Sequence, residues 1–300
     1  MQLKFACLGL ATFLLLSCPG LAQAHSVLEK VVKSGVLTAG TSKDAFPFAY
    51  RDSQGNLTGY SVEMLKLINE QVSKELNQPI KLELVALDPQ ERIAKLQQGA
   101  VDIVCDFSSF TWKREADVDF SVSYAITGTR LLVKRNSPLS DPASLVGKRI
   151  GVLPGTTAQV ALRKAQPQAQ IVLFQDRNKA YQAIQAGQID AFADDDVLLE
   201  DWLFRTKNDK TFQVASYPYS NEGVACMLPE NNSTFRDTVN YSLIRFMQGL
   251  LTQKTPNVDL FDRWFGPQGI APLTVDLRNL MIENMRLVVD SYERIPDPER

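Results

Sequence analysis

Histidine and cysteine are scarce in this chain of 300 residues, which contains one His and four Cys. The histidine is His25, and Cys7 and Cys18 lie in an apolar stretch at the N-terminus. Zinc sites usually combine four Cys and His ligands, so the two remaining cysteines do not form one. No nucleophile–base pair accompanies the polar clusters described below. The sequence therefore predicts no metal and no other cofactor.

A surplus of charge is missing too. The chain has 32 Lys and Arg against 34 Asp and Glu, a formal net charge of −2, with the two signs interspersed. Nucleic-acid binding requires a basic face, so we expect no nucleic acid as a partner. The G-x-x-x-x-G-K-[ST] loop of many ATP-binding proteins is absent as well, which argues against ATP binding by this chain.

Beyond the N-terminus no stretch approaches the ~20 apolar residues that a membrane-spanning helix needs. Residues 1–24 have the parts of a signal peptide: Lys4, an apolar run over 5–16, and Ala22-Gln23-Ala24 before the cleavage point. We therefore expect an exported, soluble, periplasmic protein. The alternative is a lipid anchor on Cys18, because Leu15-Leu16-Ser17-Cys18 resembles a lipoprotein cleavage box.

Two cysteines, Cys105 and Cys226, remain after the signal peptide. An even pair in an oxidising compartment favours a disulfide between them. The alternative is a pair of buried thiols that pack as small apolar residues.

Short apolar runs alternate with helical patterns along the chain, which is typical of parallel sheets covered by helices. Ser61 is the expected N-cap of the first long helix. Predicted strands lie at 36–40, 80–87, 101–105, 129–134, 149–153, 170–174 and 189–193. Predicted helices open at 59–61 and cover 89–98, 158–165, 178–185, 197–204, 229–251, 259–265 and 277–292.

Two extended segments, near 124–129 and 219–224, separate the first series of elements from the second. We interpret them as crossings between two lobes. The sequence thus predicts an α/β fold in which a second lobe, 127–221, is inserted into a first lobe made of 25–126 and 222–300.

Polar clusters follow the predicted strands, where ligands of open parallel sheets collect. Ser42 follows the first strand, and Ser109 and Arg114 follow the third. In the second lobe Gly155-Thr156-Thr157 and Asp195 occupy the same position after their strands. These residues select the cleft between the lobes as the candidate site.

The chemistry of these clusters suits a zwitterion. Arg114 offers the planar, two-pronged donor that a carboxylate prefers. Gly155-Thr156-Thr157 precedes a helix, whose first N–H groups attract an anion. Asp195 offers an acceptor for an ammonium group. The alternatives are a surface arginine, a plain turn and a solvated helix cap, but the combination favours binding a free amino acid over converting it.

Several short motifs, each weak alone, occur in an order that resembles one family. They are Pro47-Phe48-Ala49-Tyr50, Gly59-Tyr60-Ser61, Thr111-Trp112-Lys113-Arg114, Asp119-Phe120-Ser121, Gly155-Thr156-Thr157, Gly187-Gln188-Ile189-Asp190-Ala191 and Arg263-Trp264-Phe265-Gly266. Over nearly all of 26–266 the chain resembles the solute-binding proteins of polar amino-acid ABC transporters, family 3. Gly128-Thr129-Arg130-Leu131-Leu132 and Ala225-Cys226-Met227-Leu228 fit its glutamate/aspartate-binding branch.

The resemblance implies a two-lobed periplasmic binding protein with a Venus-flytrap fold. It assigns the ligand's α-carboxylate to Arg114, helped by Ser109 and the Thr156–Thr157 loop, and the α-ammonium to Asp195. The implied partners are a free amino acid and the membrane permease of an ABC transporter. We also expect a monomer without enzymatic activity.

The chain departs from the acidic branch where the ligand side chain is read. Ser42, with Lys43 beside it, replaces an Arg after the first strand, and Arg177 replaces a His of the second lobe. Asp106 and Phe107 replace small residues. Glutamate and aspartate remain the favoured ligands, with glutamine and asparagine as the alternative.

An enzyme is the alternative of a different class, because cyclohexadienyl dehydratases resemble this family too. Asp106 or Asp194 would then be the catalytic acid, and fold alone does not decide between the two functions. An Asp placed for an ammonium group nevertheless suits an amino acid better than prephenate.

Overall fold

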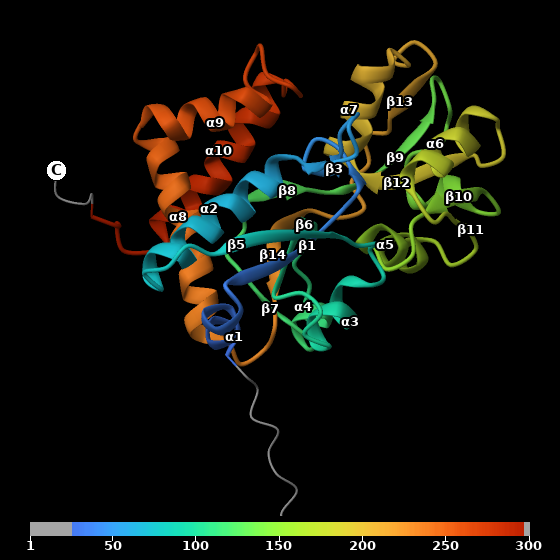
Figure 1. Ribbon diagram of the computed structural model, residues 1–300. Helices are drawn as coiled ribbons and strands as arrows, with labels where there is room; N and C mark the ends of the chain where they lie inside the picture. The colour runs from blue at the N-terminus through green and yellow to red at the C-terminus, as the bar shows by residue number, and fades with distance from the viewer. Residues whose placement is uncertain (1–25, 297–300) are drawn as a thin grey trace, which may run out of the picture.

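The computed structural model describes residues 26–296, which form two lobes joined side by side (Figure 1). Each lobe is built on its own sheet. The strand order is β5-β1-β6-β14-β7 in the first lobe, with β8 paired to β14, and β11-β10-β12-β9-β13 in the second. The predicted two-lobed α/β fold is therefore confirmed.

The first lobe combines parallel pairing of β1 with β5 and β6 and antiparallel pairing of β14 with β6, β7 and β8. A small sheet of β2, β3 and β4 lies at its edge. Its strands are β1 Val36–Thr41, β2 Asp44–Ala45, β3 Ala49–Arg51, β4 Leu57–Thr58, β5 Lys81–Ala86, β6 Ile103–Ser109, β7 Asp119–Phe120, β8 Ala125–Thr127 and β14 Glu222–Leu228. Its helices are α1 Val27–Ser34, α2 Tyr60–Glu75, α3 Arg92–Gln97, α4 Trp112–Glu115, α8 Ser233–Leu251, α9 Thr255–Phe265 and α10 Val275–Asp290.

The second lobe has β10 parallel to β11 and β12, with β9 antiparallel to β12 and β13. Its strands are β9 Thr129–Lys134, β10 Arg149–Val152, β11 Gln170–Leu173, β12 Ala191–Asp195 and β13 Phe212–Val214. Its helices are α5 Thr157–Ala165, α6 Arg177–Gln185 and α7 Asp196–Thr206, with a 3₁₀ turn at Pro142–Leu145.

The two crossings between the lobes lie side by side. β8 pairs with the start of β14, so that Thr127 is opposite Glu222, and the Tyr219 N–H donates to the Thr129 carbonyl at 2.9 Å. The boundaries at 126/127 and 221/222 stay a prediction. The signal peptide, the Cys18 anchor and His25 lie outside the described residues.

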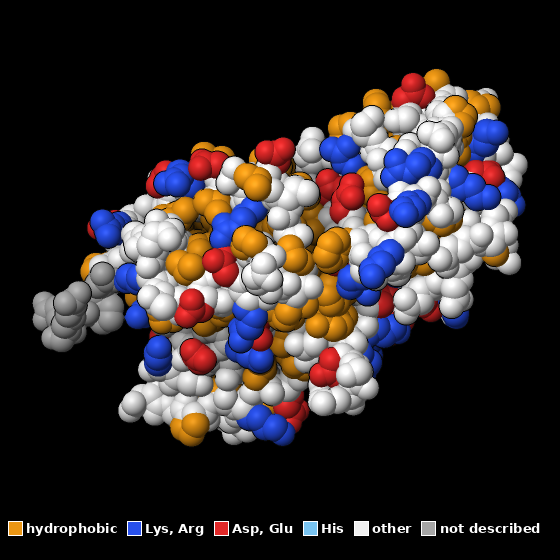
Figure 2. All heavy atoms as spheres, turned by 90° about the horizontal axis from the view of Figure 1, so that it is seen from above, with side chains coloured by type: hydrophobic (Ala, Val, Ile, Leu, Met, Phe, Trp, Pro, Cys, Tyr) orange, Lys and Arg blue, Asp and Glu red, His pale blue; other side chains and the backbone are white. Residues whose placement is uncertain are grey.

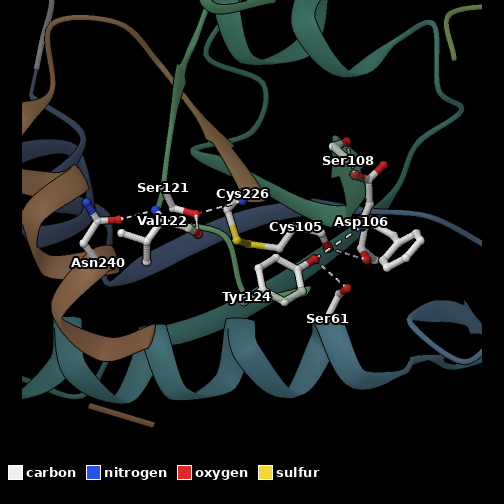
Figure 3. Close-up of a disulfide and its surroundings, with 11 residues drawn as sticks. Ser61, Cys105, Asp106, Ser108, Ser121, Val122, Tyr124, Cys226 and Asn240 are labelled. Atoms are coloured by element: carbon white, nitrogen blue, oxygen red, sulfur yellow. Dashed lines mark hydrogen bonds between the residues drawn. A yellow bond between two sulfur atoms is a disulfide. The ribbon is translucent and has the colours of Figure 1, made fainter. Parts of the chain in front are cut away.

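The expected disulfide is confirmed: Cys105 on β6 bonds to Cys226 on β14 in the core of the first lobe (Figure 3). The bond joins neighbouring strands of one sheet that are 121 positions apart in sequence.

The expectation that Ser61 caps α2 is wrong. The helix begins two residues earlier, with Gly59 as the N-cap; the φ of Gly59 is +132°, and a Cβ there would lie 2.1 Å from the Phe48 carbonyl oxygen. A residue with a side chain cannot occupy that position, so the helix start is fixed there. Ser61 is instead buried, and its hydroxyl bonds to the Tyr124 hydroxyl at 2.8 Å (Figure 3).

Helices of the described part of the chain are too short or too polar to cross a bilayer.

Candidate functional site

Arg114 connects the first lobe to the second. It lies in the short helix α4, which is capped by Thr111: the Thr111 hydroxyl accepts the Arg114 N–H at 3.1 Å. Its guanidinium donates to the Ser109 carbonyl at 2.7 Å and, across the cleft, to the Gly155 carbonyl at 2.9 Å. Ser109 is the last residue of β6 rather than part of a following loop, because the strand extends four residues further than predicted.

The Gly155 loop contacts the first lobe directly. Gly155 has φ +75°, and a Cβ there would lie 2.9 Å from the Gln90 Cα. A side chain at this position would therefore push the lobes apart. Thr156 caps α5: its hydroxyl donates to the Leu153 carbonyl at 2.7 Å and accepts the Gln159 N–H at 3.3 Å, and Thr157 is the first helical residue.

Asp195 is the last residue of β12 and also caps α7, so the predicted strand end lies two residues too early. Its Oδ1 is buried and has no hydrogen-bond partner within residues 26–296. The same holds for Oε2 of Glu222, at the start of β14. Burial, followed by the Asp194 and Glu222 carboxylates, raises the pKa of Asp195 well above its usual value. This acidic cluster needs a cation, and an ammonium group would supply one together with N–H donors.

These charges converge on Arg114. Burial and the neighbouring Arg92 lower the pKa of Arg114 to about 10, while Asp106, Glu222 and Asp195 oppose that decrease. Carboxylates of both lobes thus lie close enough to Arg114 for their fields to reach it. Glu222 was not predicted from the sequence, because a lone glutamate in an extended crossing has no distinctive pattern.

Arg177, the first residue of α6, is buried between two aspartates. Its guanidinium donates to Asp194 at 2.7 and 3.2 Å and to Asp44 of the first lobe at 3.0 Å. Its backbone N–H donates to the other Asp44 oxygen at 2.9 Å. The predicted site residues Ser42 and Lys43 flank this contact: the Ser42 hydroxyl donates to Asp44 at 3.2 Å, and Lys43 pairs with Asp88 at 2.7 Å.

Arg92 and Asp106 form a second buried pair beside Arg114. The Arg92 Nε lies 2.5 Å from an Asp106 oxygen, and its Nη1 donates to the Ser108 hydroxyl at 2.7 Å. The Ser108 hydroxyl donates to the other Asp106 oxygen at 2.5 Å (Figure 3). Arg92 was missed because its helix was predicted to begin three residues earlier, which places Arg92 inside an ordinary amphipathic pattern.

The predicted residues therefore fall into two groups. Arg114 joins the end of β6, at Ser109, to the Gly155–Thr156 loop, and Asp195 is close enough to affect its pKa. Ser42, Lys43 and Arg177 gather around Asp44. Whether each of them touches a ligand stays a prediction. Within residues 26–296 no cluster of three His, Cys, Asp or Glu side chains could hold a metal ion.

Two apolar cavities lie where the second lobe meets the C-terminal tail, and one of them extends to the crossings between the lobes. They measure about 440 and 490 Å³ and share Val197, Leu273, Leu277 and the ion pair between Arg130 and Asp196. Figure 2 shows apolar side chains gathered in the middle of the face on which α9 and α10 lie. Glu222 lines the larger of the two cavities, but Arg114 and Asp195 line neither, so neither cavity combines the cation and the carboxylates that a zwitterion needs.

Comparison with known proteins shows the family of this chain. The chain is 30% identical over 263 residues to the glutamate/aspartate import solute-binding protein of Salmonella typhimurium, covering 86% of this chain and 85% of that protein. It is 29% identical over 285 residues to the L-glutamate/L-aspartate-binding protein of Pseudomonas aeruginosa, covering 92% of each. A solved ancestral amino acid-binding protein, a precursor of cyclohexadienyl dehydratase, is 26% identical with a TM-score of 0.68 and covers 80% of this chain and 99% of its own. Because residues 37–267 match the family's sequence profile, the chain belongs to the bacterial extracellular solute-binding proteins, family 3.

Proposed function

We propose that this protein binds a free amino acid between its lobes as the extracytoplasmic component of an ABC importer. Arg114 holds the α-carboxylate, and Asp195 with Glu222 holds the α-ammonium. The observation that carries this proposal is the pair of buried, unpartnered carboxylate oxygens, Asp195 Oδ1 and Glu222 Oε2, close to an arginine that no carboxylate neutralises within residues 26–296. A zwitterion fits both halves of that arrangement.

The contacts between the lobes explain how ligand binding would favour the closed form that the permease receives. Arg114 and Asp44 each bond across the cleft, so a ligand that adds contacts to both lobes favours the closed arrangement. The proposed partner is the membrane permease, which would receive the closed, exported protein as a monomer. The relatives' names favour glutamate and aspartate as ligands, and glutamine and asparagine are the alternative.

A dehydratase activity is not part of the proposal. Asp106 and Asp194, the acids considered for it, each pair with a buried arginine. Both acids are therefore engaged by the protein's own arginines instead of being free in the cleft.

Calorimetric titration of the ligand-free protein with the twenty amino acids tests the proposal. We expect micromolar or tighter binding of at least one polar amino acid and no turnover of prephenate or arogenate. Absence of binding across the whole panel, or measurable turnover, would refute it.

A further inference from the structure

We infer that the cleft selects an amino acid with a carboxamide side chain, glutamine or asparagine, over glutamate and aspartate, because the protein's own aspartates neutralise the arginines that would read an acidic side chain. The inference rests on the proposed function and narrows its ligand class.

Arg177 has no free capacity for a second carboxylate. Its guanidinium already contacts Asp194 at two nitrogens and Asp44 at the third, and it is only 4% exposed. A ligand carboxylate there would have to displace Asp44, which would break the contact between the lobes. It would also add a charge to a site that already holds two buried acids for one cation.

Arg92 is neutralised in the same way. Asp106 lies on one side of its guanidinium and Ser108 on another, and both Arg92 and Asp106 are at least 95% buried. Arg92 therefore offers hydrogen-bond donors to a ligand without net positive charge. A carboxamide can use such a site, because its oxygen accepts from a guanidinium and its NH₂ donates to a carboxylate.

The other cations near the cleft are paired as well. Lys43 bonds to Asp88 at 2.7 Å, and Arg130 lies 3.4 Å from Asp196. Arg114 alone among these residues donates only to carbonyls within the described chain. A free amino acid brings one α-carboxylate, which uses this guanidinium and leaves none for a second carboxylate.

Two acids that each have one buried, unpartnered oxygen reinforce the argument. Asp195 and Glu222 each have an oxygen without a donor in residues 26–296, and the α-ammonium supplies one positive charge for both. A second ligand carboxylate would raise the negative charge of this region, whereas a carboxamide leaves it unchanged.

The test is calorimetry with glutamine, glutamate, asparagine and aspartate on the ligand-free exported protein and on three variants. We expect the wild type to bind an amide at least tenfold more tightly than the corresponding acid. Asp106→Asn and Asp44→Asn, which free Arg92 and Arg177, should each shift that ratio at least threefold towards the acid. Asp190→Asn, which frees the partly exposed Arg149 outside the candidate site, is the control and should leave the ratio unchanged.

The wild-type ratio decides the inference even if a variant does not fold. Equal or tighter binding of glutamate or aspartate, or tightest binding of a cationic amino acid in a wider panel, would overturn it while leaving the proposed function intact. Failure of every amino acid to bind would refute the proposed function and this inference with it.

Discussion

The regions around Arg114 and Arg177 are built from the same residue type and behave differently. Arg114 donates to two carbonyl oxygens, one in each lobe, and burial lowers its pKa to about 10. Arg177 is more deeply enclosed and donates to two aspartates. An arginine whose neighbours are carbonyls can still bind an anion, whereas one whose neighbours are carboxylates is committed to the fold. The partners of an arginine, rather than its position at a cleft, therefore decide its role.

Removing Arg177 should produce the largest effect on stability. Arg177→Ala leaves Asp194 and Asp44 buried without their cation, and breaking such a pair costs about 3–5 kcal/mol. Urea unfolding of the ligand-free protein measures this loss. Arg149→Ala is the matched control in the same lobe: Arg149 pairs with Asp190 at 2.7 Å but is partly exposed, so the expected loss is below about 1 kcal/mol. Equal losses of unfolding free energy for the two variants would contradict the claim that Arg177 stabilises the fold more than a surface arginine does.

Removing Arg114 should have a large effect on binding and a smaller one on folding. Arg114→Ala is expected to weaken every amino acid at least tenfold, or about 1.4 kcal/mol, because the α-carboxylate is common to all of them. Calorimetry gives the affinity, and a thermal scan gives the stability. Lys113→Ala, a change at the exposed neighbouring residue, controls for effects on α4. An Arg114→Ala protein that keeps wild-type affinity would contradict the assignment.

Sequence reasoning predicted the layout because the layout depends on local patterns. Helical spacing and strand-length apolar runs predicted the longer helices and most strands of both lobes, though not α4 or β13, and an even pair of cysteines predicted the disulfide. Strand ends were less certain: Ser109 and Asp195 both belong to strands that continue into the polar segment. The polar residues at the end of a strand that leads into a site break the alternation of apolar and polar residues. From the sequence alone, the last residues of such a strand are therefore assigned to a loop.

The partners of the charged residues could not be predicted. Arg177 meets Asp44 from 133 positions away, and Arg92 meets Asp106 only because α3 packs beside β6. Such pairs depend on how the lobes and layers pack, which no local pattern records. Arg177 was identified as a cation near the ligand, but the sequence contains no sign that two aspartates enclose it.

The pH dependence of binding gives the smallest expected effect and tests the role of Asp195. Burial and the Asp194 and Glu222 carboxylates raise the pKa of the Asp195 carboxyl, so the free protein takes up a proton there at a higher pH than an ordinary aspartate does. The α-ammonium pairs only with the carboxylate, so binding expels that proton. Affinity is therefore full above the raised pKa and falls as the pH falls through it, by no more than about tenfold per pH unit, the limit for one proton. Calorimetry in buffers of different ionisation enthalpy measures the released proton. Asp195→Asn, which has no titrating carboxyl, should bind more weakly and release less of it, and an unchanged proton release in that variant would assign the linkage to another group.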